Sequence, residues 1–262
     1  MPETASVDPA IRGVLRRPFA EQVAFFRAKM GNLIPTAKWT DVWKSGHDVG
    51  FMVAGAAKAD LLADFAASVL RAIEDGITLE QFRKEFDSIV SKHGWSHTGS
   101  RNWRSRVIYN TNIAVSYAAG REAQIRDAGY AYKMYRHSDA SKTPRPHHVS
   151  WNGLVLSIDD PFWETHTAPN GWECKCRIIG IRNEAAARRF GGRWGDEPPA
   201  GWDKIDPKTG EQVGIDKGWG YNPGGSVAPV RKSIQAKAQG LPEQLRRDLL
   251  ADVESVRQRG QP

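Results

Sequence analysis

The first half of the chain repeats apolar side chains every three or four residues, the spacing that is typical of amphipathic helices. One stripe begins at Phe19 and continues at positions 23, 26 and 30, and a second covers 61–73 and stops before a glycine. A third follows Thr78 and Gln81, whose spacing predicts a capping box. A fourth helix is predicted over 103–128, and the side chains expected on its inner face are Val107, Ile108, Ala114, Tyr117 and Ile125.

After Gly129 the pattern becomes that of short strands and turns. Residues 130–137 alternate in the way that half-buried strands do. Two more short strands are predicted over 154–158 and 176–181, followed by a short helix over 184–190 and a hairpin over 202–215. An extended segment, the strap, is predicted over 219–226. The last predicted element is a helix over 231–257 whose apolar face is narrow.

These patterns predict an α+β protein in which a helical domain precedes a small, loop-rich mixed domain with short antiparallel strands and a C-terminal helix. The expected boundaries are a flexible N-terminus over 1–18, the helical domain over 19–129, the mixed domain over 130–225 and a C-terminal helix or tail over 226–262.

Composition adds a moderate basic excess. The formal net charge is +7 and the pI is about 9.5, but acidic residues are interspersed with the basic ones, which favours a solvated surface of mixed charge. A polyanionic partner is the alternative, and double-stranded DNA would then be held nonspecifically and in a salt-dependent way. The candidate phosphate contacts are Arg101, Arg104, Arg106, Arg188 and Arg189.

Nothing at the start resembles a secretory signal, and no apolar run approaches the length of a membrane span. We therefore expect a protein that is assembled in a cytoplasm without a membrane partner.

Of the ten Trp residues, all but Trp39 and Trp43 follow position 94. Large rings that fill the core of a small domain explain this best, and base-stacking platforms are the alternative.

Candidate metal ligands occur between positions 139 and 176. Cys174 and Cys176 project to one face if they lie in a strand, so both sulfurs can reach one ion, and His148 completes a set of three. Zinc in structural sites prefers four nitrogen or sulfur ligands. The candidates for the fourth ligand are His147, His166, His137 and Asp139, of which we select His166. Cysteines that are buried as small hydrophobic residues are the alternative.

The same segment holds polar and turn residues that we expect to brace its loops. Arg145 is expected to pair with Asp139 or Asp160, and the other expected bracing residues are Asn152, Gly153, Trp163 and Asn170. An enzymatic alternative is a metal-dependent nuclease. In it His147 or His148 would be the general base, oriented by Asn152 or Asn170, with His166 as a third histidine.

The ordered motifs resemble the phage head morphogenesis family named for the F protein of phage Mu. The resemblance extends over about 19–225, and it is carried by Tyr109-Asn110-Thr111-Asn112, Arg145-Pro146-His147-His148, Asn152-Gly153, Asp159-Asp160-Pro161-Phe162-Trp163, Pro169-Asn170-Gly171-Trp172 and Cys174-Lys175-Cys176. The family pattern is matched at Arg145, His148, Gly153, Cys174 and Cys176. The spacing between Asp139 and Arg145 departs from it, as does Lys175, where arginine is common.

The resemblance implies a minor head protein without enzymatic activity. Such a protein would be found in the virion head near the portal, where it would act in procapsid assembly and in DNA packaging or delivery. The implied partners are portal, capsid and scaffold proteins, together with packaged double-stranded DNA. A zinc-scaffolded, nonspecific DNA-binding module and the nuclease described above are the competing functions.

Overall fold

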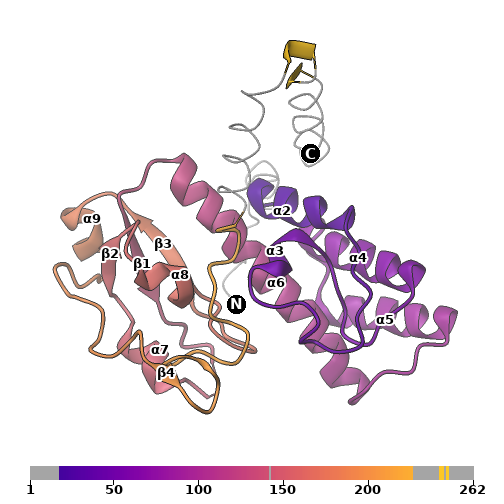
Figure 1. Ribbon diagram of the computed structural model, residues 1–262. Helices are drawn as coiled ribbons and strands as arrows, with labels where there is room; N and C mark the ends of the chain where they lie inside the picture. Colours follow the sequence, from indigo (N-terminus) through magenta and orange to yellow (C-terminus); the bar gives the residue numbers. More distant parts are fainter. Residues whose placement is uncertain (1–17, 142, 227–241, 245, 248–262) are drawn as a thin grey trace, which may run out of the picture.

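The computed structural model describes residues 18–141, 143–226, 242–244 and 246–247 (Figure 1). The flexible N-terminus predicted over 1–18 and the helix predicted over 231–257 fall almost wholly outside these residues, so both stay predictions. The described part is a mixture of helices and short antiparallel strands in the predicted order, which confirms the α+β fold class.

Within the described residues, the first half contains α2 (Ala20–Met30), α3 (Gly46–Val49), α4 (Ala59–Glu74) and α5 (Leu79–His93). Their core is built from the predicted stripes, with Phe26, Phe65 and Phe86 each at most 1% exposed. The capping box is confirmed: the Thr78 hydroxyl accepts from the Gln81 backbone N–H, and the Gln81 side chain accepts from the Thr78 N–H.

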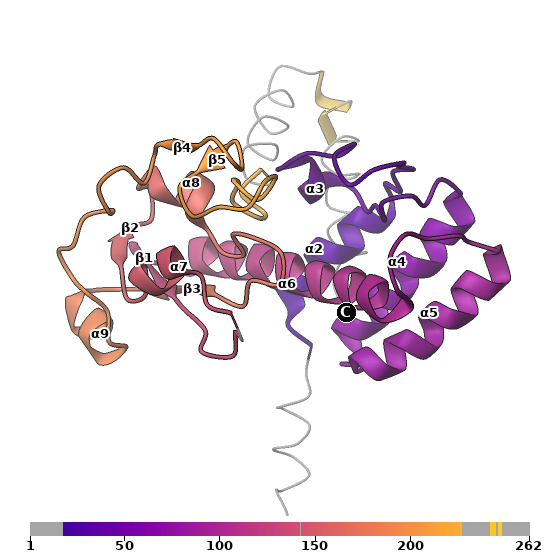
Figure 2. The ribbon, with the colours of Figure 1, turned by 90° about the horizontal axis from the view of Figure 1, so that it is seen from below.

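Helix α6 (Arg101–Asp127) crosses the molecule, with α4 and α5 beside its first half and the strands beside its second half (Figure 2). Ile108 packs in the core of the helical half, whereas Val115 and Ile125 pack in the core around the sheet. Helix α6 therefore contributes to both cores. The prediction that Tyr117 faces inward is wrong, since its side chain is 38% exposed.

The three-stranded antiparallel sheet has the order β2-β1-β3, with β1 (Tyr132–Arg136) between β2 (Val155–Ser157) and β3 (Arg177–Ile181). All three strands were predicted. Two short helices in turn-rich sequence, α7 (Pro146–Ser150) and α8 (Phe162–His166), were not. Beyond β3 follow α9 (Glu184–Arg189) and a small hairpin of β4 (Ile205–Asp206) and β5 (Glu211–Gln212).

An ion pair between fully buried side chains ties the sheet to α6. Lys133 of β1 is 0% exposed, and its Nζ lies 2.6 Å from a carboxylate oxygen of Glu122, whose side chain is 3% exposed. Lys133 also lies over the ring of Trp163, at 5.9 Å. This pair fixes the orientation of β1 against the second half of α6.

The predicted strap returns the chain to the helical half. Trp219 and Tyr221 are buried, and the N–H of Gly224 and the hydroxyl of Ser226 both donate to one carboxylate oxygen of Asp48, at 3.0 and 2.7 Å. Gly224 has φ +78°, and a Cβ there would lie 2.9 Å from the Cβ of Ala119. The strap consequently lies close against α6.

None of the helices in the described part of the chain combines the length and the apolar composition that a membrane crossing requires.

Candidate metal centre

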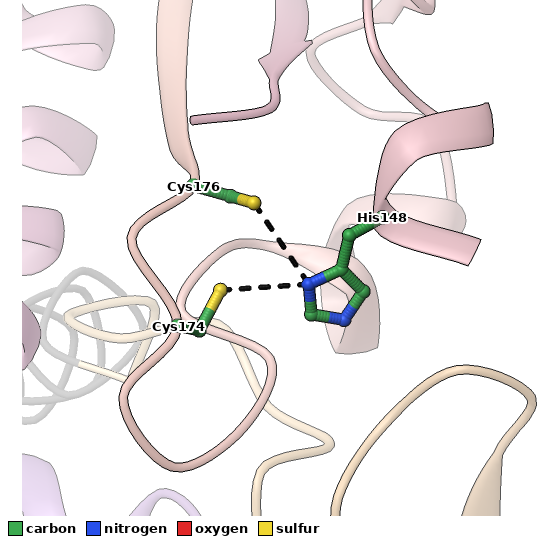
Figure 3. Close-up of side chains that lie close together, drawn as sticks. All are labelled: His148, Cys174 and Cys176. Carbon is green, nitrogen blue, oxygen red and sulfur yellow. Dashed lines mark hydrogen bonds between the residues drawn. The ribbon is translucent and has the colours of Figure 1, made fainter. Parts of the chain in front are cut away.

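His148, Cys174 and Cys176 converge inside the mixed half (Figure 3). His148 lies on α7, and the two cysteines flank Lys175 immediately before β3. Nδ1 of His148 lies 3.6 Å from Sγ of Cys174 and 3.8 Å from Sγ of Cys176, and the three atoms are all within 4.8 Å of one another. His148 and Cys174 are buried.

The hydrogen bonding of His148 determines which ring nitrogen carries the proton, and the other nitrogen presents its lone pair to the sulfurs. Nε2 lies 3.0 Å from the carbonyl oxygen of Gly214, which can only accept, so Nε2 carries the proton and Nδ1 is unprotonated in the neutral ring. A histidine that binds metal through one nitrogen usually donates from the other to a carbonyl or carboxylate. The ring is also stacked on Trp151, with centroids 5.1 Å apart, which holds its plane.

The distances can be compared with those that zinc requires. With zinc–sulfur and zinc–nitrogen bonds of about 2.3 and 2.05 Å and a tetrahedral angle, ligand nitrogen and sulfur lie about 3.6 Å apart. The separations from His148 to the two sulfurs, 3.6 and 3.8 Å, fit this value. The lone pair on Nδ1 can accept from at most one of the two sulfurs, whereas one shared cation would satisfy all three atoms. The residues present therefore fit a zinc ion.

The thiols differ in their affinity for protons. The pKa of Cys176 is lowered, chiefly by a hydrogen bond from Cys174 and against the opposing effect of burial. The pKa of Cys174 is raised, because it donates to Cys176 and is buried. These opposite shifts favour a thiolate at Cys176, and the thiolate is the form of cysteine that binds metal.

Among the candidates for a fourth ligand, His137 contacts one of the two sulfurs: its Nδ1 is 3.4 Å from Sγ of Cys176, although it lies outside the group of three whose ligand atoms are all within 4.8 Å of one another. His166 is not brought into the cluster. It is stacked on Phe162 at 4.2 Å, its Nδ1 contacts the Thr165 hydroxyl, and burial lowers its pKa to about 4. The other two candidates, His147 and Asp139, are exposed.

The expected pairing of Arg145 is wrong. The guanidinium binds neither Asp139 nor Asp160; it binds Asp216 at 2.6 Å and the carbonyl of Trp172 at 3.0 Å. The carboxylate of Asp216 also accepts from the Trp172 N–H at 3.0 Å. Arg145 and Asp216 therefore clamp the loop that carries the cysteines to the segment after β5.

The remaining predicted bracing residues all make contacts within the mixed half. The Asn170 side chain accepts from the Tyr135 hydroxyl and donates to the carbonyls of Thr165 and Thr167, so every polar atom of this amide is used inside the fold. The other contacts are Asn152 Oδ1 accepting from the His137 N–H, Asp160 Oδ1 accepting from the Phe162 N–H, and Trp163 Nε1 donating to the Ser157 carbonyl. Gly153 has φ +81°, and a Cβ there would meet the Gly191 carbonyl oxygen at 2.9 Å.

This arrangement offers little to a nuclease mechanism. A general base needs a free lone pair directed at water, but Nε2 of His148 is bonded to a carbonyl and Nδ1 faces two sulfurs. His147 is exposed, yet neither proposed orienting amide contacts it, since Asn170 is fully buried and Asn152 bonds to the His137 backbone.

The candidate phosphate-binding arginines do not share a face. Arg101, Arg104 and Arg106 lie at the start of α6, whereas Arg188 and Arg189 lie on α9 at the opposite end of the molecule (Figures 1 and 2). Three of them already have acidic partners: Arg101 binds Asp87 at 2.6 Å, Arg106 binds Glu173 at 2.6 Å and Arg188 binds Glu184 at 2.6 Å.

Comparison with known proteins identifies the class. Residues 63–179, which contain α6, His148 and both cysteines, match the family described as Phage Mu protein F like protein. The resemblance predicted from the motifs is therefore confirmed, and this region belongs to the Mu F-like family. No solved structure matches the chain.

Two relatives are informative. The chain is 32% identical over 276 residues to the putative capsid assembly protein F of Escherichia phage Mu, an alignment that covers 88% of this chain and 61% of that protein. It is 28% identical over 248 residues to the Mu-like prophage FluMu F protein of Haemophilus influenzae, with coverage of 80% and 59%. The chain thus spans about three fifths of the length of either relative.

Proposed function

We propose that this chain is a head assembly protein of a Mu-like phage or prophage, without enzymatic activity. The observation that carries the proposal is its similarity to the putative capsid assembly protein F of phage Mu over most of its length. Assembly would take place in the host cytoplasm, and the protein would be retained in the virion head near the portal. Portal, capsid and scaffold subunits are the proposed protein partners.

We further propose that His148, Cys174 and Cys176 bind a structural zinc ion, with His137 as the fourth ligand in place of His166. Support comes from the two sulfurs at 3.6 and 3.8 Å from one unprotonated nitrogen, and from the third contact at 3.4 Å. When bound, zinc would cross-link α7, the end of β1 and the start of β3. A small domain with short strands gains much of its folding free energy from such a link.

The assembly role is tested by deleting the gene from the phage or induced prophage and complementing it. We expect loss of infectious, DNA-filled heads, with restoration by the wild-type chain and by His147→Ala, which removes an exposed histidine next to the cluster. His148→Ala should fail to restore them. Normal particle number, DNA content and infectivity after deletion would refute the assembly role.

The two competing functions can be tested on the purified chain. A nuclease would nick plasmid DNA in the presence of divalent ions and lose this activity in His148→Ala, and we expect no nicking. Binding of packaged DNA would be nonspecific and would weaken steeply as salt is raised. The net charge of +7 supports such binding, but the separation of α9, which carries Arg188, from the start of α6, which carries Arg104, argues against a single recognition face.

A further inference from the structure

A second concave site lies where the strap meets the helical half. It is a cleft of about 1010 Å³, and it is lined by residues from the α3 region, the start of α6 and the strap. Its walls are notably aromatic, with six indole rings: Trp39, Trp43, Trp95, Trp103, Trp172 and Trp219. The cleft includes none of the candidate metal ligands.

Two cations in this cleft are buried without an ion-pair partner. Lys29 is 5% exposed and Arg104 is 8% exposed, and neither forms an ion pair with a carboxylate of the described residues. Arg104 donates to the Ala54 carbonyl and lies 5.3 Å from the ring of Trp95, while its Nε has no hydrogen-bond partner. Burial of a charge that is not neutralised is strongly unfavourable, so such groups are normally paired.

The neighbouring titratable groups offset this positive charge only in part. Burial lowers the pKa of Lys29 to about 8, so Lys29 is still charged at pH 7, and Asp48 attracts it from beyond ion-pair distance without lining the cleft. His47 is neutral at pH 7, since burial and the charge of Lys29 lower its pKa to about 4.

The other charged residues that line the cleft leave a net positive charge. Glu173, the acidic residue among those that line the cleft, is already bound to Arg106 at 2.6 Å. Two exposed lysines, Lys38 and Lys217, add further positive charge. The cleft as a whole is complementary to an anion.

We propose that this cleft binds an acidic peptide segment of another protein, with its carboxylates at Lys29 and Arg104 and an apolar side chain against the indole rings. The rings favour a peptide over a nucleic acid. Trp39 is stacked on Trp43 at 5.6 Å, and Trp172 packs edge-on against both Trp39 and Trp219, so the faces that bases would need are largely used. Two isolated buried cations also suit carboxylates better than a continuous phosphate track does.

The proposal depends on neither the metal nor the head assembly role. It is tested by fluorescence anisotropy with a labelled pentapeptide of sequence Glu-Phe-Glu-Leu-Glu, its Gln-Phe-Gln-Leu-Gln counterpart, and an oligothymidylate of about ten nucleotides. We expect the acidic peptide to bind at least about tenfold more tightly than either of the other probes, a difference of about 1.4 kcal/mol.

Substitutions of the two buried cations test whether the peptide binds in this cleft. Lys29→Met should weaken binding of the acidic peptide by about tenfold or more, whereas Lys84→Met, the same change on the exposed face of α5, should leave affinity within about twofold. Arg104→Met repeats the test, with circular dichroism as a check on folding. Tighter binding of the oligothymidylate, no preference for the acidic peptide, or wild-type affinity in Lys29→Met would each overturn the proposal.

Discussion

The buried pair Lys133–Glu122 provides a prediction whose size follows from the contacts of each partner. Breaking a buried ion pair by removing one side chain costs about 3–5 kcal/mol, because the remaining charge is left uncompensated. In Lys133→Met, Glu122 keeps Arg126 at 2.6 Å, so we expect the lower end, about 3 kcal/mol. In Glu122→Gln, Lys133 keeps the ring of Trp163 at 5.9 Å and the more distant attraction of Asp159, but no carboxylate of the described residues lies within ion-pair distance, which predicts the upper end, about 5 kcal/mol.

Urea denaturation followed by circular dichroism measures both values. With a slope of about 3 kcal/mol per molar urea, a loss of 3 kcal/mol moves the midpoint by about 1 M. The double variant Lys133→Met with Glu122→Leu should recover most of the loss, since two apolar side chains replace the pair. Lys92→Met, which removes the exposed partner of Asp64, should cost less than about 1 kcal/mol. Single-variant losses as small as this control, or no recovery in the double variant, would refute the reasoning.

Three further predictions follow from local contacts. Thr78→Ala removes the capping box of α5 and should lower the unfolding free energy by about 1 kcal/mol, measured by urea denaturation. The pKa of His47 is about 4 in the folded chain against 6.5 for a free histidine, so the unfolded state takes up the proton first and stability falls as pH drops from 6.5 toward 4. His47→Gln should lose less stability over that range in urea titrations. Removal of zinc with a chelator should lower the melting temperature of the wild type and leave Cys174→Ser unchanged.

The helical half is largely predictable from local sequence. The stripe containing Phe26, the capping box at Thr78 and the long helix that became α6 all depend on spacing within a few turns, and the structure confirms them. Tyr117 is the exception. Periodicity identifies an apolar face but not how wide the covered part of that face is. The ring of Phe19 lies 5.7 Å from that of Tyr117, yet the described residues leave Tyr117 38% exposed.

The candidate site was only partly predictable, because its partners come from distant parts of the chain. The cysteine spacing and His148 were visible in the sequence. Asp216, which binds Arg145, is 71 residues away from it, and no local pattern indicates the pairing. Gly214, whose carbonyl orients His148, acts through its backbone and leaves no side-chain signal. Helix α7 was missed although Pro146 at its start is a recognised signal of a helix N-terminus.

Metal content of the purified chain tests the proposed zinc centre most directly. Elemental analysis combined with native mass spectrometry should find one zinc per chain in the wild type and in His147→Ala, and much less in Cys174→Ser and His148→Ala. Loss in His137→Ala but not in His166→Ala would assign the fourth ligand. A wild-type chain that is folded, free of metal after expression with zinc, and no more stable than Cys174→Ser would contradict the account.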